Sequence, residues 1–258
     1  MKYLNKTITC LAISLITSFT ALSQEHCFNS GEFLEFKVKY LNFNTSTATL
    51  ETRDATWEEK PVYHIIGKGW SSRFLSFFFK IQDRFESYVD TKNLQPYHFI
   101  RDTYEGGYTK DVEINFDQEN QKAEVFDKKR NTKKTLETSH KVFDMISSFY
   151  YLRNKIDPKT LKIGEDHQLN IFFDEENFAF RLKFLGREEI KTKFGKKTCL
   201  KFRPLVIADR IFKEDESLTL WVSDDKNKVP VKISAKLVVG TLTANLSKYK
   251  GLKFSHGW

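Results

Sequence analysis

The 258-residue sequence is poor in the residues that interrupt regular structure, with 5 prolines and 11 glycines. It contains no Gly- or Ser-rich linker, no low-complexity tract and no short internal repeat. We therefore expect one folded domain rather than two domains joined by a flexible segment. Its mean hydropathy of −0.49 excludes a polytopic membrane protein. With 40% hydrophobic and 29% charged residues, the composition is that of a globular protein that can bury a core.

The motifs that anchor common enzymes are also absent. The sequence has no Gly-x-Ser-x-Gly elbow, no His-Glu-x-x-His, no Cys-x-x-Cys and no glycine-rich phosphate loop. His64 and His98 fall in expected strands without a second ligand at metal spacing. The neighbouring Asp224 and Asp225 are better explained by a turn than by an acid/base pair. We expect a non-enzymatic protein without metal or cofactor. A hydrolase of envelope polymers is kept as an alternative to the two binding functions given below.

The N-terminus has the pattern of an export signal. Lys2 and Lys6 precede an apolar stretch over residues 8–20, which is short for a membrane span, and residues 21–23 are Ala-Leu-Ser. We predict cleavage before Gln24, which leaves a mature domain of residues 24–258. The alternative is a retained N-terminal anchor helix. The prediction implies a periplasmic or secreted protein.

Removal of the signal would leave two of the three cysteines. Cys10 lies inside the apolar stretch, so only Cys27 and Cys199 remain in the mature chain. An even number of cysteines in an oxidising compartment favours a disulfide bridge between them. Counting cannot prove the pair, and two free thiols are the alternative.

Alternation of apolar and polar residues with period two recurs along about a dozen segments, as in residues 34–40, 112–116 and 178–184. Residues 218–222, 229–239 and 242–249 predict an antiparallel meander with a turn at residues 224–227. One segment, residues 142–153, has a helical period instead, with Ser139 or Asp144 as candidate N-cap and Pro158 beyond its end. These patterns predict a mainly β protein: one large curved antiparallel sheet, a half-barrel or barrel-like, with one α-helix packed on its concave face.

Several segments resemble the DUF3108 family of bacterial envelope proteins. They are Asp-Arg-Phe-Glu-Ser-Tyr-Val-Asp at residues 83–90, Asp-Met-Ile-Ser-Ser-Phe-Tyr-Tyr-Leu-Arg at 144–153, and the segments at 195–202 and 221–225. The resemblance extends over residues 31–252. It implies an uncharacterised periplasmic or secreted protein of a Gram-negative bacterium, with an architecture similar to the half-barrels of periplasmic lipoprotein and lipid carriers. It supplies no catalytic residue.

An aromatic cluster over residues 70–79 exceeds expectation for a chain that already contains 24 phenylalanines. One interpretation is that the cluster crosses the core or packs under the helix. The other is that it lines or lids an apolar cavity. The predicted ligand-binding residues are Trp70, Phe74, Phe77, Phe78, Phe79 and Phe149.

The charge is basic, with 42 Lys and Arg against 34 Asp and Glu. The densest basic segment, residues 128–134, is interpreted as a solvated hairpin tip centred on Asn131, without the aromatic residues of a single-strand nucleic-acid site. We expect no nucleic-acid partner. Two functions follow: a carrier that binds a hydrophobic small molecule or lipid in the concave face, or a structural or assembly factor that binds an envelope protein.

Overall fold

The computed structural model describes residues 25–207, 218–255 and 258, and the predicted signal segment lies outside them. The described chain is mostly β-structure, with one α-helix and one short 3-10 turn. The strands are β1 (Phe33–Tyr40), β2 (Phe43–Trp57), β3 (Lys60–Ser71), β4 (Ile81–Asp90), β5 (Pro96–Glu105), β6 (Tyr108–Asp117), β7 (Lys122–Asp127), β8 (Thr132–Glu137), β9 (Val142–Phe143), β10 (Asp166–Phe173), β11 (Glu176–Thr192), β12 (Gly195–Ile207), β13 (Leu218–Ser223), β14 (Pro230–Lys236) and β15 (Thr241–Lys250). The helix is α1 (Met145–Lys155), and the 3-10 turn is η1 (Leu75–Phe77).

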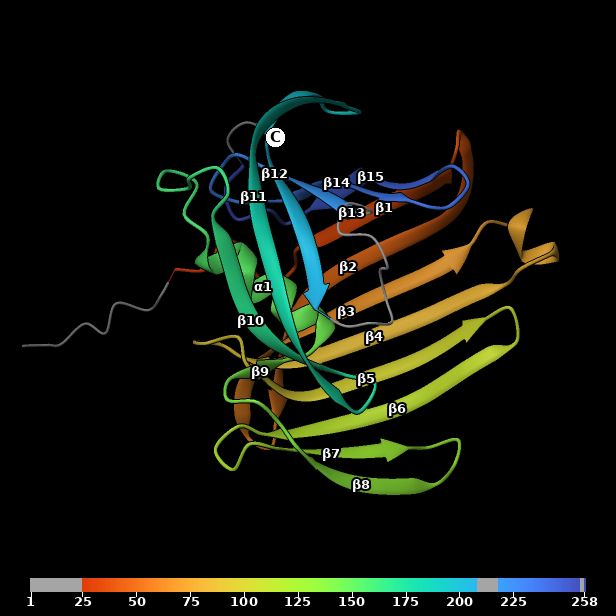
Figure 1. Cartoon of the computed structure of the whole chain (residues 1–258), viewed down its shortest axis with the longest axis vertical. Coiled ribbons are helices and arrows are strands. Elements are labelled where there is room, and N and C mark those ends of the chain that lie inside the picture. Colours follow the sequence, from red (N-terminus) through yellow and green to blue (C-terminus); the bar gives the residue numbers. More distant parts are fainter. Residues whose placement is uncertain (1–24, 208–217, 256–257) are drawn as a thin grey trace, which may run out of the picture.

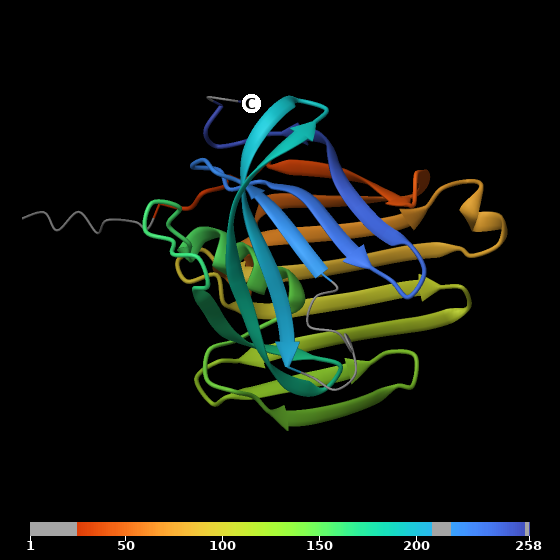
Figure 2. The ribbon, with the colours of Figure 1, turned by 45° about the horizontal axis from the view of Figure 1, so that its top comes forward.

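All the strands belong to one sheet made of two meanders. Strands β1 to β8 follow one another in order, strands β15 back to β10 continue beyond β1, and β1 pairs with β15. The neighbouring strands of the described sheet pair antiparallel, except that β9 and β10 pair in parallel. The sheet curves until β10, β11 and β12 cross in front of the first meander (Figures 1 and 2). The predicted large curved antiparallel sheet is confirmed, and among the described strands it is open, with β8 and β9 at its edges.

Side chains, rather than backbone pairs, connect the two meanders across this opening. The tip of the β10–β11 hairpin reaches the first meander, where Asp174 accepts from Arg101 at 2.6 Å and Glu175 accepts from Lys134 at 2.5 Å. The Asn177 side chain accepts from the backbone N–H of Ser139 at 2.9 Å. These exposed contacts hold the curvature without closing the hydrogen-bond ladder.

Helix α1 lies on the concave side, where it contacts β3, β4, β9 and β10 (Figure 1). Of the two candidate caps, Asp144 is the N-cap: its carboxylate accepts from the N–H groups of Ile146 and Ser147 at 2.7 and 2.8 Å. The helix begins three residues later than predicted because Val142 and Phe143 instead pair with β10. It ends at Lys155, before Pro158, as the sequence indicates.

Two predicted turns are also confirmed. Asn131 adopts a φ of 53° in the β7–β8 connection, a left-handed conformation that asparagine tolerates better than most residues. The turn at residues 224–227 joins β13 to β14, and β15 completes the predicted meander. The basic segment at residues 128–134 is therefore a hairpin tip with its flanking strand.

Candidate functional site

A cavity of about 740 Å³ lies between the concave face of the sheet and helix α1. Its helix side is formed by Ile146, Phe149 and Leu152, all on one face of α1. Large apolar side chains of β11, β12 and β13 form a second wall: Phe178, Phe180, Leu182, Leu200, Phe202 and Leu220. These residues occupy alternate positions of their strands, so the period-two pattern of the sequence is what directs them to one face.

The opposite wall includes several small residues among larger ones such as Phe36, Leu50 and Phe85. Ala48 of β2, Gly67 and Gly69 of β3 and Ala244 of β15 all line the cavity. A Cβ at Gly67 would lie 3.3 Å from Ile146 Cδ1, so glycine permits the close approach of the helix there. A Cβ at Gly69 would meet only Asp83, at 3.9 Å or more. Because large side chains face small ones, the sheet and the helix do not fill the space between them.

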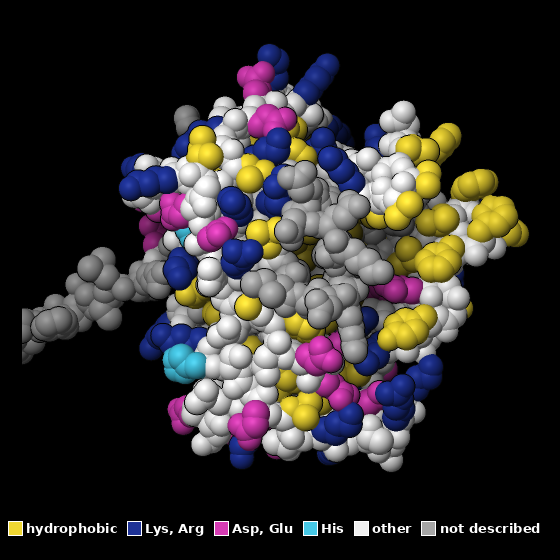
Figure 3. Space-filling view, in the orientation of Figure 1, with side chains coloured by type: hydrophobic (Ala, Val, Ile, Leu, Met, Phe, Trp, Pro, Cys, Tyr) yellow, Lys and Arg dark blue, Asp and Glu magenta, His cyan; other side chains and the backbone are white. Residues whose placement is uncertain are grey.

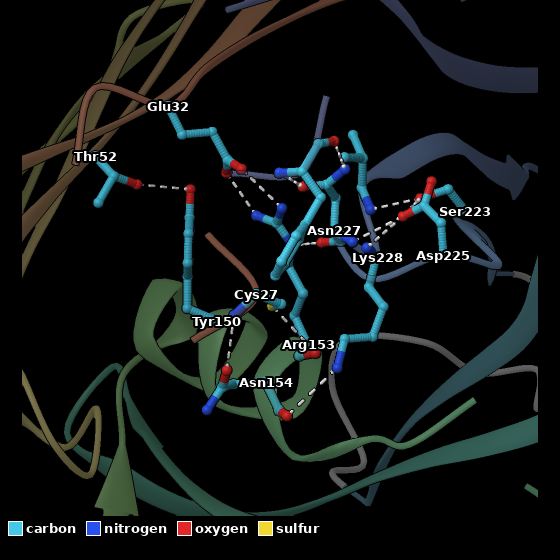
Figure 4. Close-up of polar contacts among 12 residues, drawn as sticks. Cys27, Glu32, Thr52, Tyr150, Arg153, Asn154, Ser223, Asp225, Asn227 and Lys228 are labelled. Atoms are coloured by element: carbon cyan, nitrogen blue, oxygen red, sulfur yellow. Dashed lines mark hydrogen bonds and ion pairs between the residues drawn. The ribbon is translucent and has the colours of Figure 1, made fainter. Parts of the chain in front are cut away.

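A buried ion pair closes one end of this space. Arg153 of α1 donates to both carboxylate oxygens of Glu32, at 2.5 and 2.8 Å, and its Nε donates to the backbone oxygen of Asn227 at 2.9 Å (Figure 4). Burial by itself would lower the pKa of Arg153, but the adjacent Glu32 carboxylate raises it above its ordinary range. Although Arg153 lines the cavity, Glu32 neutralises its charge.

Lys228 is the second buried cation of the cavity wall, with 9% exposure, whereas Lys68, the third cation of the lining, is exposed. Its Nζ donates to the backbone oxygens of Ile156 at 2.8 Å and Asn154 at 3.4 Å, at the C-terminal end of α1 (Figure 4). Among the residues that the structure describes, it forms no ion pair with a carboxylate. Burial lowers the pKa of Lys228 below its ordinary value. The cavity therefore has one buried ammonium group whose charge is not neutralised by direct contact.

Asp83 of β4 lines the cavity from the opposite side to α1. Burial first, and then the neighbouring Glu105, raises the pKa of Asp83 to about 6. No group of three His, Cys, Asp or Glu side chains in the described part of the chain could hold a metal ion. The arrangement can bind an apolar body with an anionic end, and it presents no nucleophile paired with a base among these lining residues.

The six predicted ligand-binding residues are separated in the structure. Phe149 lines the cavity, whereas Trp70 near the end of β3 and the four phenylalanines of the β3–β4 connection are not part of its lining. Phe74, Phe77 and Phe78 are 80%, 89% and 78% exposed. The segment therefore neither crosses the core nor packs under α1, and a ligand-binding role for it stays a prediction.

The disulfide expected between Cys27 and Cys199 is not formed, which corrects that prediction. Both cysteines are buried, but they belong to different apolar clusters: Cys27 packs near Phe28 and Tyr150, and Cys199 packs with Trp221. The Cys27 thiol donates to the backbone oxygen of Arg153 at 3.4 Å. An even cysteine count carries no information about distance, so burial of two thiols in separate clusters was equally compatible with it.

Sequence patterns did not identify Glu32, Arg153 and Lys228 as neighbours, because they are distant along the chain and each resembles a surface charge. The wall that contains the small residues has a signal in the sequence. Gly67 and Gly69 interrupt the interior of a strand, where glycine marks a close approach or an empty space. The structure shows that they do both.

None of the described helices is long and apolar enough to cross a membrane. The sequence matches none of the curated proteins with which it was compared. Among solved structures, it is similar to a beta-barrel-like protein of the domain of unknown function DUF1849 from Brucella abortus, with a TM-score of 0.56 and 9% identity over 88% of this chain and 100% of that chain. This likeness confirms a barrel-like fold.

Weaker structural similarity is found to two further proteins, both with a TM-score of 0.36. One is a candidate exported protein with a YmcC-like fold from Bacteroides fragilis, at 10% identity over 87% of this chain and 98% of that one. The other is a candidate lipoprotein from Parabacteroides distasonis, at 12% identity over the same shares. The sequence profile of the DUF3108 family matches residues 35–247, so the chain belongs to this family of proteins of unknown function.

Proposed function

We propose that the protein is a non-enzymatic binding protein of the cell envelope that holds a hydrophobic ligand, such as the acyl chain of a lipid, in the cavity beside α1. The observation that carries the proposal is the cavity itself: about 740 Å³ of space with an almost wholly apolar lining. Ligand sites in proteins are commonly about 300 to 1,000 Å³ and mostly apolar.

The apolar lining itself supports an occupant. Because the cavity is open on one side, its apolar walls meet water when no ligand is bound, and covering apolar surface is worth about 25 cal/mol per Å². The chain could have filled the space with larger residues at Ala48, Gly69 and Ala244, each of which faces it. An apolar ligand would supply the contacts that these small residues leave unmade.

Lys228 supports an anionic end for that ligand. Its ammonium group lies in the cavity wall, bonded to carbonyl oxygens but not to a carboxylate. A carboxylate or phosphate that entered the cavity beside it would restore the favourable charge interaction that burial removes. A fatty acid and a phospholipid both have this chemistry. The alternative of an assembly factor predicts an interior filled by its own side chains, which the cavity does not favour.

The first experiment asks what the cavity contains. The protein is purified from the cell envelope without detergent, weighed by native mass spectrometry, and then extracted with organic solvent under denaturing conditions. We expect extra mass that is released as lipid. A bare protein that also fails to bind added cis-parinaric acid, a fluorescent fatty acid, would reject the carrier function and favour a protein partner.

The second experiment tests the anionic end. Lys228→Met is expected to weaken binding of cis-parinaric acid about tenfold, the value of one charge-assisted hydrogen bond, and to leave binding of the uncharged hexadecanol unchanged. Lys226→Met is the matched control, because Lys226 is exposed in the same turn. Equal effects of the two variants, or equal losses for acid and alcohol, would contradict a headgroup role for Lys228.

A further inference from the structure

Five hairpin connections lie along the same end of the sheet, on the right in Figure 1. Alternate connections of a meander share an edge, which places together those between β14 and β15, β1 and β2, β3 and β4, β5 and β6, and β7 and β8. We call these tips the hairpin rim and define it as residues 41–43, 70–80, 104–108, 128–131 and 237–239.

Contacts link each tip to the next. The Tyr40 hydroxyl donates to the Val239 oxygen at 3.0 Å, and the Ser72 N–H donates to the Thr45 oxygen at 2.6 Å. The Gly106 N–H donates to the Lys80 oxygen at 2.9 Å. The basic tip contacts β6 just below the β5–β6 tip: the Lys128 N–H donates to the Asp111 oxygen at 2.9 Å, and the Lys129 ammonium group donates to the Thr109 hydroxyl. The rim is therefore one continuous surface and not five independent loops.

Exposed apolar side chains are concentrated on the rim. Of the 14 large hydrophobic residues that are exposed in the described chain, all but Met145 and Ile163 belong to it. The most exposed members, each above 70%, are Phe43, Phe74, Phe77, Phe78, Val238 and Val239. Figure 3 shows the patch at the right-hand edge of the molecule. Contiguous exposure of this kind is rare on a protein that meets only water.

Basic side chains accompany the apolar ones. Arg73 and Lys80 flank the 3-10 turn of the aromatic tip and are exposed. Lys128, Lys129 and Arg130 are consecutive at the β7–β8 tip, which the β5–β6 tip separates from the aromatic tip. Glu105 is the acidic residue within the rim, while Lys128 and Arg130 contact Glu113 and Asp127 just beside it. The surface thus combines insertable phenylalanines with an excess of positive charge.

We propose that the hairpin rim docks onto the anionic surface of a lipid bilayer, with Phe74, Phe77 and Phe78 entering the interface and the basic tip contacting lipid phosphates. Apolar insertion together with a polybasic patch is the pair of signals that gives stable but reversible attachment. The Trp and Tyr residues at the base of the tips suit the headgroup region. A protein partner that adds a β-strand to the sheet is not favoured at the rim, because the rim strands are already paired on both sides except at β8.

Docking does not depend on whether the cavity holds a ligand, because the rim lies outside its lining. The two surfaces are nevertheless adjacent: Gly69 lines the cavity, and the next residue, Trp70, belongs to the rim. Docking would therefore bring the cavity beside a membrane.

The test is co-sedimentation with vesicles. Protein expressed from the full chain is purified, and its N-terminus is read by mass spectrometry, because a retained apolar segment would itself bind lipid. We expect binding to vesicles of phosphatidylethanolamine with phosphatidylglycerol, weaker binding to phosphatidylcholine alone, and loss of that difference at high salt. Brominated lipid should quench part of the tryptophan fluorescence of the wild-type protein. That quenched part should be missing in Trp70→Phe.

Two sets of variants separate the apolar and basic contributions. F77S/F78S is expected to weaken vesicle binding at least about tenfold, because the variant loses the two phenylalanine side chains that would be buried in the bilayer. Binding of cis-parinaric acid should stay unchanged. Ile163→Ser, at a site 79% exposed in the loop between α1 and β10, is the matched control. K128Q/K129Q/R130Q should lose the preference for phosphatidylglycerol, and K159Q/K162Q should keep it.

Several outcomes would overturn the proposal. One is a wild-type protein, verified as folded by circular dichroism, that does not sediment with the anionic vesicles. Another is an equal loss of binding in F77S/F78S and Ile163→Ser. A third is a wild-type oligomer that F77S/F78S converts to a monomer without any vesicle binding, which would make the rim a contact between copies. Vesicle docking without cis-parinaric acid binding would instead reject the carrier function alone.

Discussion

Arg153 and Glu32 form a two-point ion pair in the interior, with Nη1 to Oε1 at 2.5 Å and Nη2 to Oε2 at 2.8 Å. The arginine comes from helix α1 and the glutamate immediately precedes β1. Because Arg153 Nε also donates to Asn227 in the β13–β14 connection, one side chain joins three distant parts of the chain. The pair sets the position of the helix at one end of the cavity.

Arg153→Met is expected to destabilise the protein by about 3 to 5 kcal/mol, because it leaves the Glu32 carboxylate buried without a partner. The measurement is the free energy of unfolding in urea. Glu32→Leu should cost a similar amount for the reciprocal reason. The double variant E32L/R153M should lose less than the sum of the two single variants, since no unpaired charge remains. Additive losses would show that the two residues act independently.

Asp144 is fully buried at the N-terminus of α1, and burial raises its pKa to about 6 despite hydrogen bonds from Ser87 and the helix N–H groups. A folded-state pKa above the unfolded value means that the folded protein binds the proton more tightly. The stability from this group is present at low pH and is lost as pH rises from about 4 to about 6. The shift corresponds to about 2 to 3 kcal/mol.

Asp144→Asn should remove this pH dependence while keeping the cap, because the amide oxygen can still accept from Ile146 and Ser147. The difference in unfolding free energy between wild type and variant, measured from pH 4 to pH 8, isolates the group from the other titrating residues. Asp144→Ala should cost about 1 to 2 kcal/mol at every pH through loss of the cap. A difference between wild type and Asp144→Asn that does not change with pH would contradict the raised pKa.

The sheet was predictable because each strand has its apolar residues on one face, which is a local property of the sequence. The helix was predictable from its apolar period, and Asp144 was one of its two candidate N-caps. Its first residues were assigned wrongly because Val142 and Phe143 fit the helical period but gain more from pairing with β10. Tertiary contacts decided the boundary.

The candidate site was much less predictable. Phe149 was found because it belongs to a helix with a clear apolar face, but the cavity depends on Gly67, Gly69 and Ala244, whose effect appears only when strands are placed side by side. The aromatic segment was recognised as unusual, yet composition could not tell an interior cluster from an exposed hairpin tip. That distinction depends on the turn geometry around η1.

The two cysteines should behave as inert buried thiols. Burial, and then the nearby Asp225, raises the pKa of Cys199 to about 12, and burial raises that of Cys27. The reactive thiolate of Cys199 is then roughly one part in ten thousand at pH 8. We expect slow alkylation by iodoacetamide in the native protein, rapid alkylation of both in urea, and an unfolding midpoint that reductant does not change. An intact mass lower by two hydrogens without reductant would contradict this.

Filling the cavity should remove ligand binding without unfolding the protein. Ala244 of β15 faces the cavity from the wall that contains the small residues, so Ala244→Leu places three more carbon atoms in open apolar space. We expect stability to stay unchanged or to rise by up to about 1 kcal/mol, as in other cavity-filling substitutions. The affinity for cis-parinaric acid should fall about tenfold, because the added side chain occupies volume that the ligand needs.

Ala179→Leu is the matched control for this substitution. Ala179 lies in β11 between Phe178 and Phe180, which both line the cavity, so its own side chain points to the opposite face, where it is exposed. The same change in size should there leave fatty-acid binding unaltered. If Ala244→Leu lowered the unfolding free energy by several kcal/mol, the space would be too small for the added atoms. If it left binding intact, the ligand would have to occupy a different part of the protein, and the proposed site would be wrong.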